Sequence, residues 1–133
     1  MADIIIRPNQ PVQILSTAAR TTEQTVSYQL AEGCNGIILF IDVTVDAASG
    51  SITPSIDIAD PGGDNDMESV TAFSAIAAVG HFIKVIALGA VETAAVTPLE
   101  VQGIPAPSRG QFKMAVADTD SLTYGVRAYG VPS

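Results

Sequence analysis

The stretch Gly36-Ile37-Ile38-Leu39-Phe40-Ile41-Asp42-Val43-Thr44-Val45 decides the fold class. Every second position from Ile37 to Val45 is aliphatic, and this period of two predicts a β-strand with one face in a core. Ile38 and Phe40 make the other face apolar over the first half of the stretch. A strand that is apolar on both faces is typical of the centre of a sheet.

The residues that follow predict a β-hairpin over residues 37–59. Asp46 to Gly50 form a loop of hairpin length, and Ile52, Ile56 and Ile58 then alternate with polar residues. Pro54 lacks a backbone donor, so its strand should lie at a sheet edge or contain a bulge.

The same alternation recurs elsewhere in the chain. Residues 24–30 predict one strand, and residues 110–117 and 122–131 predict two more, joined as a second hairpin by residues 118–121. The inward residues expected on these two closing strands are Phe112, Met114 and Val116, and Leu122, Tyr124, Val126 and Ala128. Residues 68–79 are rich in alanine and fit a helix and a strand equally well. Eight or nine strands without an internal repeat predict an all-β protein, an antiparallel two-sheet β-sandwich of jelly-roll type.

The N-terminal residues predict an extended arm. A short run from Asp3 to Arg7 is closed by Pro8-Asn9-Gln10-Pro11, whose prolines cannot continue a ladder of hydrogen bonds. We therefore divide the chain into an arm, residues 1–16, and a single β-sandwich domain, residues 17–133. The apolar cluster of the arm fits a core or a subunit contact. We expect Ile4, Ile5, Ile6 and Arg7 to contact a neighbouring subunit or a capsid.

Composition limits the classes of partner. The chain has 133 residues, 47% of them hydrophobic and only 15% charged, so we expect some apolar surface to meet another subunit or partner. A net charge of -8 repels phosphate groups, which disfavours nucleic acid and membrane surfaces as partners. Cys34 is the single cysteine and no signal peptide is recognisable, which fits synthesis in a reducing cytoplasm.

One acidic segment invites a calcium hypothesis. Its carboxylates are Asp57, Asp60, Asp64, Asp66 and Glu68. Hard cations need several such oxygens, but an EF-hand alignment puts Ala59 and Pro61 at positions that require side-chain ligands. A solvated acidic turn is the favoured interpretation and an irregular ion site is the alternative. We expect no resident metal or cofactor.

The sequence offers no catalytic constellation, and we expect no catalytic residues. His81 is the sole histidine, and neither it nor Cys34 has a catalytic partner nearby in the sequence. Lys113 and Arg127 should both point away from the core of the second hairpin. They are either ordinary solvated residues or contacts to acidic groups of a neighbouring subunit.

Three segments carry a family resemblance. They are Gly36 to Thr44, Ser51-Ile52-Thr53-Pro54-Ser55-Ile56-Asp57-Ile58-Ala59-Asp60-Pro61, and the closing stretch from Phe112 to Val126. In these segments the chain resembles small virion structural proteins of tailed bacteriophages, the capsid decoration or cement proteins. The middle of the chain, from Gly63 through the Ala-rich run, departs from that pattern.

The resemblance implies a non-enzymatic head decoration protein on the capsid surface. Such a protein would form a homo-oligomer, commonly a trimer, and would bind and stabilise the lattice of the major capsid protein. Two alternatives stay open: a tail or neck component of the phage, and a carbohydrate- or ligand-binding β-sandwich module. The poverty in aromatic residues, 5% of the chain, counts against the binding module.

Overall fold

The central strand expected from residues 36–45 is confirmed. In the computed structural model, strand β4 (Cys34–Val45) lies between β10 (Leu122–Pro132) and β7 (Gly80–Ala87). Its Ile37, Leu39 and Ile41 side chains are almost completely buried. The structure describes residues 4–45, 50–59, 67–87, 99–104, 106–116 and 121–132, with the backbone alone at residues 59, 67–71 and 99.

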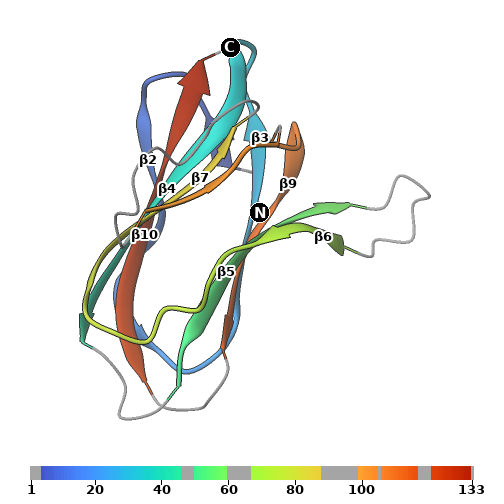
Figure 1. Ribbon diagram of the computed structural model, residues 1–133. Coiled ribbons are helices and arrows are strands. Elements are labelled where there is room, and N and C mark those ends of the chain that lie inside the picture. Colours follow the sequence, from blue (N-terminus) through green and yellow to red (C-terminus); the bar gives the residue numbers. More distant parts are fainter. Residues whose placement is uncertain are drawn as a thin grey trace.

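These described residues form ten strands in two sheets and no helix (Figure 1). The other strands are β1 (Ile4–Ile6), β2 (Pro11–Arg20), β3 (Gln24–Leu30), β5 (Ile52–Ala59), β6 (Met67–Ala72), β8 (Leu99–Gln102) and β9 (Arg109–Val116). Sheet A has the order β1-β3-β9-β5-β6, and sheet B has the order β2-β10-β4-β7-β8. Both sheets are mixed, because β1 runs parallel to β3 and β8 runs parallel to β7.

The two sheets enclose one hydrophobic core. Tyr28 and Phe112 of sheet A stack with ring centroids 4.5 Å apart, and they belong to the same buried cluster as the inward side chains of sheet B. Of the seven inward positions expected for the closing strands, Val116 is half-buried against the core and the other six are confirmed as buried. These are Phe112 and Met114 of β9, and Leu122, Tyr124, Val126 and Ala128 of β10.

Both predicted hairpins are wrong. β4 and β5 do not pair: β4 belongs to sheet B, whereas β5 lies in sheet A between β9 and β6. β9 and β10 likewise lie in different sheets. A short connection can return a strand beside its predecessor or carry it across the gap of about 10 Å between packed sheets, and turn composition does not separate the two.

The N-terminal residues also differ from the expected arm. β1 pairs with β3, β2 pairs with β10, and Ile6 is fully buried in the core. Asn9 lies between them in the left-handed region, with φ 58°, and its amide donates to the Gly130 carbonyl oxygen at 3.0 Å. The prolines therefore mark a crossing from one sheet to the other, and not the end of a detached segment.

Two local ambiguities are resolved. Residues 67–72 form strand β6, and residues 73–79 continue without a helix. Pro54 lies in an inner strand, but β6 pairs with β5 only from Ser55 onward, and a register shift falls between Ile56 and Asp57. The paired ends of β5 and β6 extend away from the two layers in Figure 1.

Within the described residues, no helix has the length and hydropathy needed to cross a membrane.

Candidate interaction surface

The outer face of sheet B carries apolar side chains where a solvent-facing sheet normally carries polar ones. Ile38 of β4 is paired with Val85 of β7, and Phe40 is paired with Ile83. On the other side, Ile38 is paired with Tyr129 of β10. All five side chains are only half-buried. We call this group, Ile38, Phe40, Ile83, Val85 and Tyr129, the apolar stripe.

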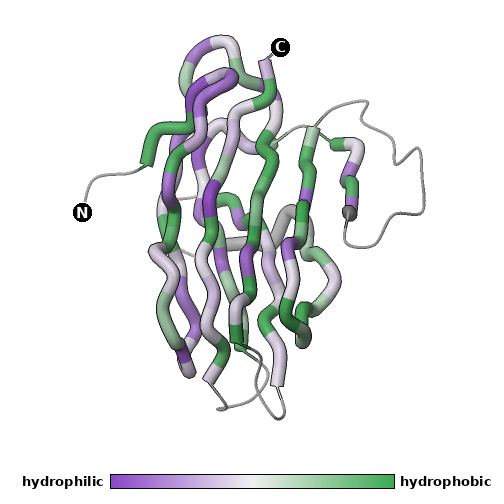
Figure 2. Tube along the Cα trace, turned by 90° about the vertical axis from the view of Figure 1, so that its left-hand side faces the viewer, coloured by the Kyte–Doolittle hydropathy of each residue, from purple (hydrophilic) through white to green (hydrophobic). Residues whose placement is uncertain are grey.

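Sheet B faces the viewer in Figure 2, where long hydrophobic stretches run along its neighbouring strands. Two further valines, Val45 and Val79, are each 56% exposed and lie at one end of the β4–β7 pair. The apolar surface is therefore not limited to isolated positions. A surface of this kind marks an interaction site more often than a monomer's free face.

The outer face of sheet A is different in kind. Its β3 strand presents Thr25, Ser27 and Gln29, which are exposed and polar. On β9, Lys113 Nζ lies 3.7 Å from Glu23 Oε1. This contrast between two sheets of one sandwich identifies the outer face of sheet B as the candidate interaction surface.

An exposed contact between a histidine and an aspartate borders the apolar stripe. His81 Nδ1 of β7 lies 2.7 Å from Asp42 Oδ1 of β4, and the two residues are direct cross-strand partners. The His81 side chain is 87% exposed and that of Asp42 is 37% exposed. Solvent screens such a pair, so it adds little to stability, but it uses one side of the Asp42 carboxylate.

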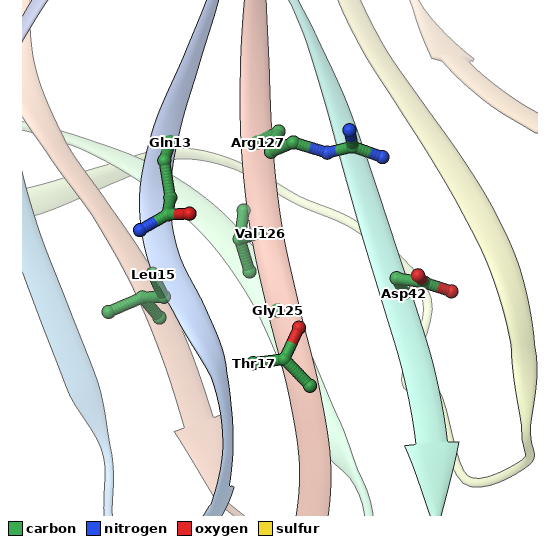
Figure 3. Close-up of a pocket in the computed structure, with 7 residues that line it drawn as sticks. All are labelled: Gln13, Leu15, Thr17, Asp42, Gly125, Val126 and Arg127. Atoms are coloured by element: carbon green, nitrogen blue, oxygen red, sulfur yellow. The ribbon is translucent and has the colours of Figure 1, made fainter.

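A hollow of about 290 Å³ lies next to this pair, above β10. Gln13 and Thr17 of β2 line it on one side, and Asp42 of β4 lines it on the other (Figure 3). Arg127 reaches from β10 across β4. Leu15, Gly125 and Val126 complete the lining. The hollow and the apolar stripe share one face, because Arg127 is the cross-strand partner of Phe40.

Gly125 keeps the floor of the hollow free of a side chain. A Cβ at this position would lie 2.6 Å from Thr17 Oγ1 and 3.2 Å from the Thr17 backbone nitrogen. β2 comes this close at a β-bulge. Leu15 is paired with Val126 and Ala18 with Tyr124, so β2 has one residue more than β10 between these two pairs. Such bulges also protect an edge strand from unwanted pairing.

The structure separates the residues expected at a subunit contact. Arg127 is exposed on the candidate surface, whereas Lys113 lies on the opposite face of the sandwich because β9 and β10 belong to different sheets. Ile6 is fully buried and therefore faces no partner in this conformation. Ile4 and Ile5 are half-buried and Arg7 is exposed.

The acidic segment is only partly described. Asp57 is 3% exposed and accepts hydrogen bonds from Gln111 Nε2 at 3.1 Å and Ser55 Oγ at 3.4 Å. Asp60, Asp64 and Asp66 lie outside the described residues, as does the side chain of Glu68. Asp57 is thus engaged in sheet A, and within the described part of the chain no three metal-binding side chains gather.

The two residues considered for catalysis have local partners. His81 pairs with Asp42, as described above. The Cys34 thiol donates to the Ile6 carbonyl oxygen at 3.5 Å, and burial raises its pKa. A raised pKa keeps the thiol protonated and lowers its reactivity.

One part-buried ion pair connects β7 and β8. Lys84 is 5% exposed, and its Nζ donates to Glu100 Oε1 at 2.9 Å. The Ser74 amide also donates to Glu100 Oε1, at 2.9 Å. Burial alone would raise the pKa of Glu100, but the hydrogen bonds and charge of Lys84, with those of Ser74, outweigh it and lower this pKa. This pair stabilises the sheet edge and lies away from the hollow.

The sequence did not predict the hollow. Its outward apolar residues Ile38 and Phe40 predicted only a central strand, and not an exposed apolar surface. Ile38 and Phe40 gave a signal, because they made β4 apolar on both faces. The hollow had no local signal, since it needs β2, β10 and β4 side by side. Comparison of the chain with protein-family models, with curated proteins and with solved structures found no match in any of the three.

Proposed function

We propose that the protein is a non-enzymatic virion structural protein, a head decoration protein that binds and stabilises the major capsid protein lattice of a tailed bacteriophage. In this proposal it assembles with itself, as a trimer, through the outer face of sheet B. The assembled protein sits on the capsid surface after synthesis in the bacterial cytoplasm. A tail or neck position in the virion is the close variant.

The observation that carries the proposal is the apolar stripe. Ile38, Phe40 and Val85 point outward from the central strand β4 and its neighbour β7, yet they are only half-buried in the single chain. Covering such side chains contributes roughly 25 cal/mol per Å² of apolar area. A second copy that covers the stripe would recover this free energy.

Strand order supports the finer architecture in the proposal, a jelly-roll sandwich. β2, β10, β4 and β7 are neighbours in sheet B, and β3, β9, β5 and β6 are neighbours in sheet A. Successive strands from β2 to β5 alternate between the sheets, β5 and β6 pair within sheet A, and β1 and β8 are added at the edges. This architecture is common in viral capsid proteins and also in lectins, so it supports the function only in combination with the apolar stripe and the resemblance.

The experiment replaces one residue of the apolar stripe and a matched residue on the other sheet. We expect Val85→Lys to disrupt self-association, because it places a charge in the covered face, and we expect Ser27→Lys to leave it intact. Sedimentation equilibrium gives the mass of each variant, and urea unfolding verifies that both are folded.

The same proteins then test the capsid role. The wild type and Ser27→Lys should co-sediment with capsids from the source virion that lack this protein, and Val85→Lys should remain in the supernatant. A wild type that stays monomeric and does not bind capsids would refute the proposal.

A further inference from the structure

Within the described residues, Arg7 and Arg127 are both exposed and have no side-chain partner, and of the two only Arg127 lines the hollow. The chain has only six Lys and Arg residues against 14 Asp and Glu. Lys84 pairs with Glu100, Lys113 pairs with Glu23, and Arg20 donates to backbone carbonyl oxygens. Arg127 is exposed on the candidate surface, and its side chain has no ion pair or hydrogen bond within the described residues.

Three other polar side chains line the hollow with Arg127. The Gln13 amide and the Thr17 hydroxyl are exposed on β2, beside the floor that Gly125 keeps open. Asp42 brings the one negative charge, but His81 Nδ1 already lies 2.7 Å from it. A group that enters the hollow therefore meets the Arg127 guanidinium and the Thr17 hydroxyl, and in Figure 3 the Gln13 side chain turns its amide oxygen toward the hollow. The planar fork of an arginine matches a carboxylate with two parallel hydrogen bonds.

We propose that the hollow receives a carboxylate, supplied by an aspartate or glutamate side chain of a second copy of this chain. The inference rests on the proposed self-assembly and names the polar contact within it. Charge complementarity identifies the source: each copy carries 14 Asp and Glu against six Lys and Arg, and Arg127 offers a positive charge beside the apolar stripe where a neighbour docks. In a closed trimer, the acid comes from a different surface of the neighbour, since such interfaces are heterologous.

The first arm of the test measures self-association of the full chain by sedimentation equilibrium. Arg127→Gln should raise the concentration needed for half-assembly roughly tenfold and weaken its dependence on NaCl. Lys113→Gln removes the same charge from the opposite face and should change neither quantity. Equal association of Arg127→Gln and the wild type would overturn the second copy as the source of the carboxylate.

The second arm uses the stripe variant Val85→Lys, in which assembly is removed. Tetraglutamate is titrated into the ¹⁵N-labelled protein, with tetraglutamine as the control peptide. We expect tetraglutamate alone to shift the backbone amide signals of Thr17, Gly125 and Arg127, and Arg127→Gln in the same background to abolish the shifts. Unchanged signals would overturn the carboxylate site itself.

The two arms keep the proposals distinguishable. A wild type that is monomeric at every concentration overturns the proposed self-assembly and, with it, the second copy as occupant. Tetraglutamate shifts in that case would still support a carboxylate site, filled by a free acid or by another protein.

Discussion

Thr17 Oγ1 occupies the space that any side chain at position 125 would need, since a Cβ on Gly125 would lie 2.6 Å from it. Gly125→Ala should therefore lower the free energy of unfolding by about 1–3 kcal/mol, the usual cost of overpacking. Thr17→Ala alone should have a small effect, because Thr17 is exposed. The double variant should recover part of the loss, since the contact with the Thr17 backbone nitrogen remains. Urea unfolding of the three variants measures these free energies. An equal loss in Gly125→Ala and in the double variant would contradict the prediction.

The two most buried tyrosines should respond differently to loss of the hydroxyl group. Tyr124 Oη is buried without a hydrogen-bond partner in the described part of the chain, whereas Tyr28 Oη donates to the Pro107 carbonyl oxygen at 2.9 Å. Tyr28→Phe should lower the free energy of unfolding by about 0.5–1.5 kcal/mol. Tyr124→Phe should leave it unchanged or raise it, because no hydrogen bond is lost. A larger loss in Tyr124→Phe than in Tyr28→Phe would argue against this.

The same tyrosines predict a loss of stability in alkali. Burial raises the pKa of both Tyr28 and Tyr124 above the ordinary value of about 10. Above that pH the unfolded state loses phenolic protons that the folded state keeps, so the stability that is fully present at lower pH declines as pH rises. Unfolding curves from pH 8 to 11 should show this decline, and it should be smaller in Tyr124→Phe. An equal decline in wild type and variant would contradict the assignment.

Lowering the pH should reduce the free energy of unfolding through protonation of Glu100. Its pKa is lowered in the folded state, so the unfolded state binds the proton more readily, and the contribution to stability is lost as pH falls below roughly 4.3. The free energy of unfolding in Glu100→Gln should therefore vary less between pH 5 and 3 than in the wild type. Glu23→Gln, at an exposed pair on sheet A, is the matched control and should follow the wild type. An unchanged pH dependence in Glu100→Gln would refute the role of this pair.

Arg20 should stabilise the bulged end of β2. Its guanidinium donates to the carbonyl oxygens of Ser16, Ala18 and Tyr124, and it lies 4.9 Å from the centre of the Tyr124 ring. Arg20→Gln should lower the free energy of unfolding by about 1–3 kcal/mol, since a hydrogen bond to a charged group contributes more than a neutral one. Hydrogen exchange should be faster at β2 and β10. Uniform exchange rates along both strands would count against this role.

The alternation of Ile37, Leu39 and Ile41 was sufficient to predict a buried central strand, and that of Phe112 and Met114 predicted an inward face correctly. Strand partners were not predictable in this way. The residues that join β4 to β5 have the composition of a turn, yet the next strand crosses to the other sheet. Ile6 is buried through contacts with distant strands, which local sequence does not record. For the same reason Gln13, Arg127 and Asp42 gave no sign that they line one hollow.

The strand between β2 and β4 is β10, which follows every other strand in the chain. During synthesis, β2 and β4 therefore cannot form their hydrogen bonds with β10 until residues 122–132 have been made. Pairing over such sequence distances is slow, and it leaves β4, apolar on both faces, exposed in the nascent chain. We expect high-level expression to be limited by aggregation at this step, and slower translation or lower temperature to raise the soluble yield.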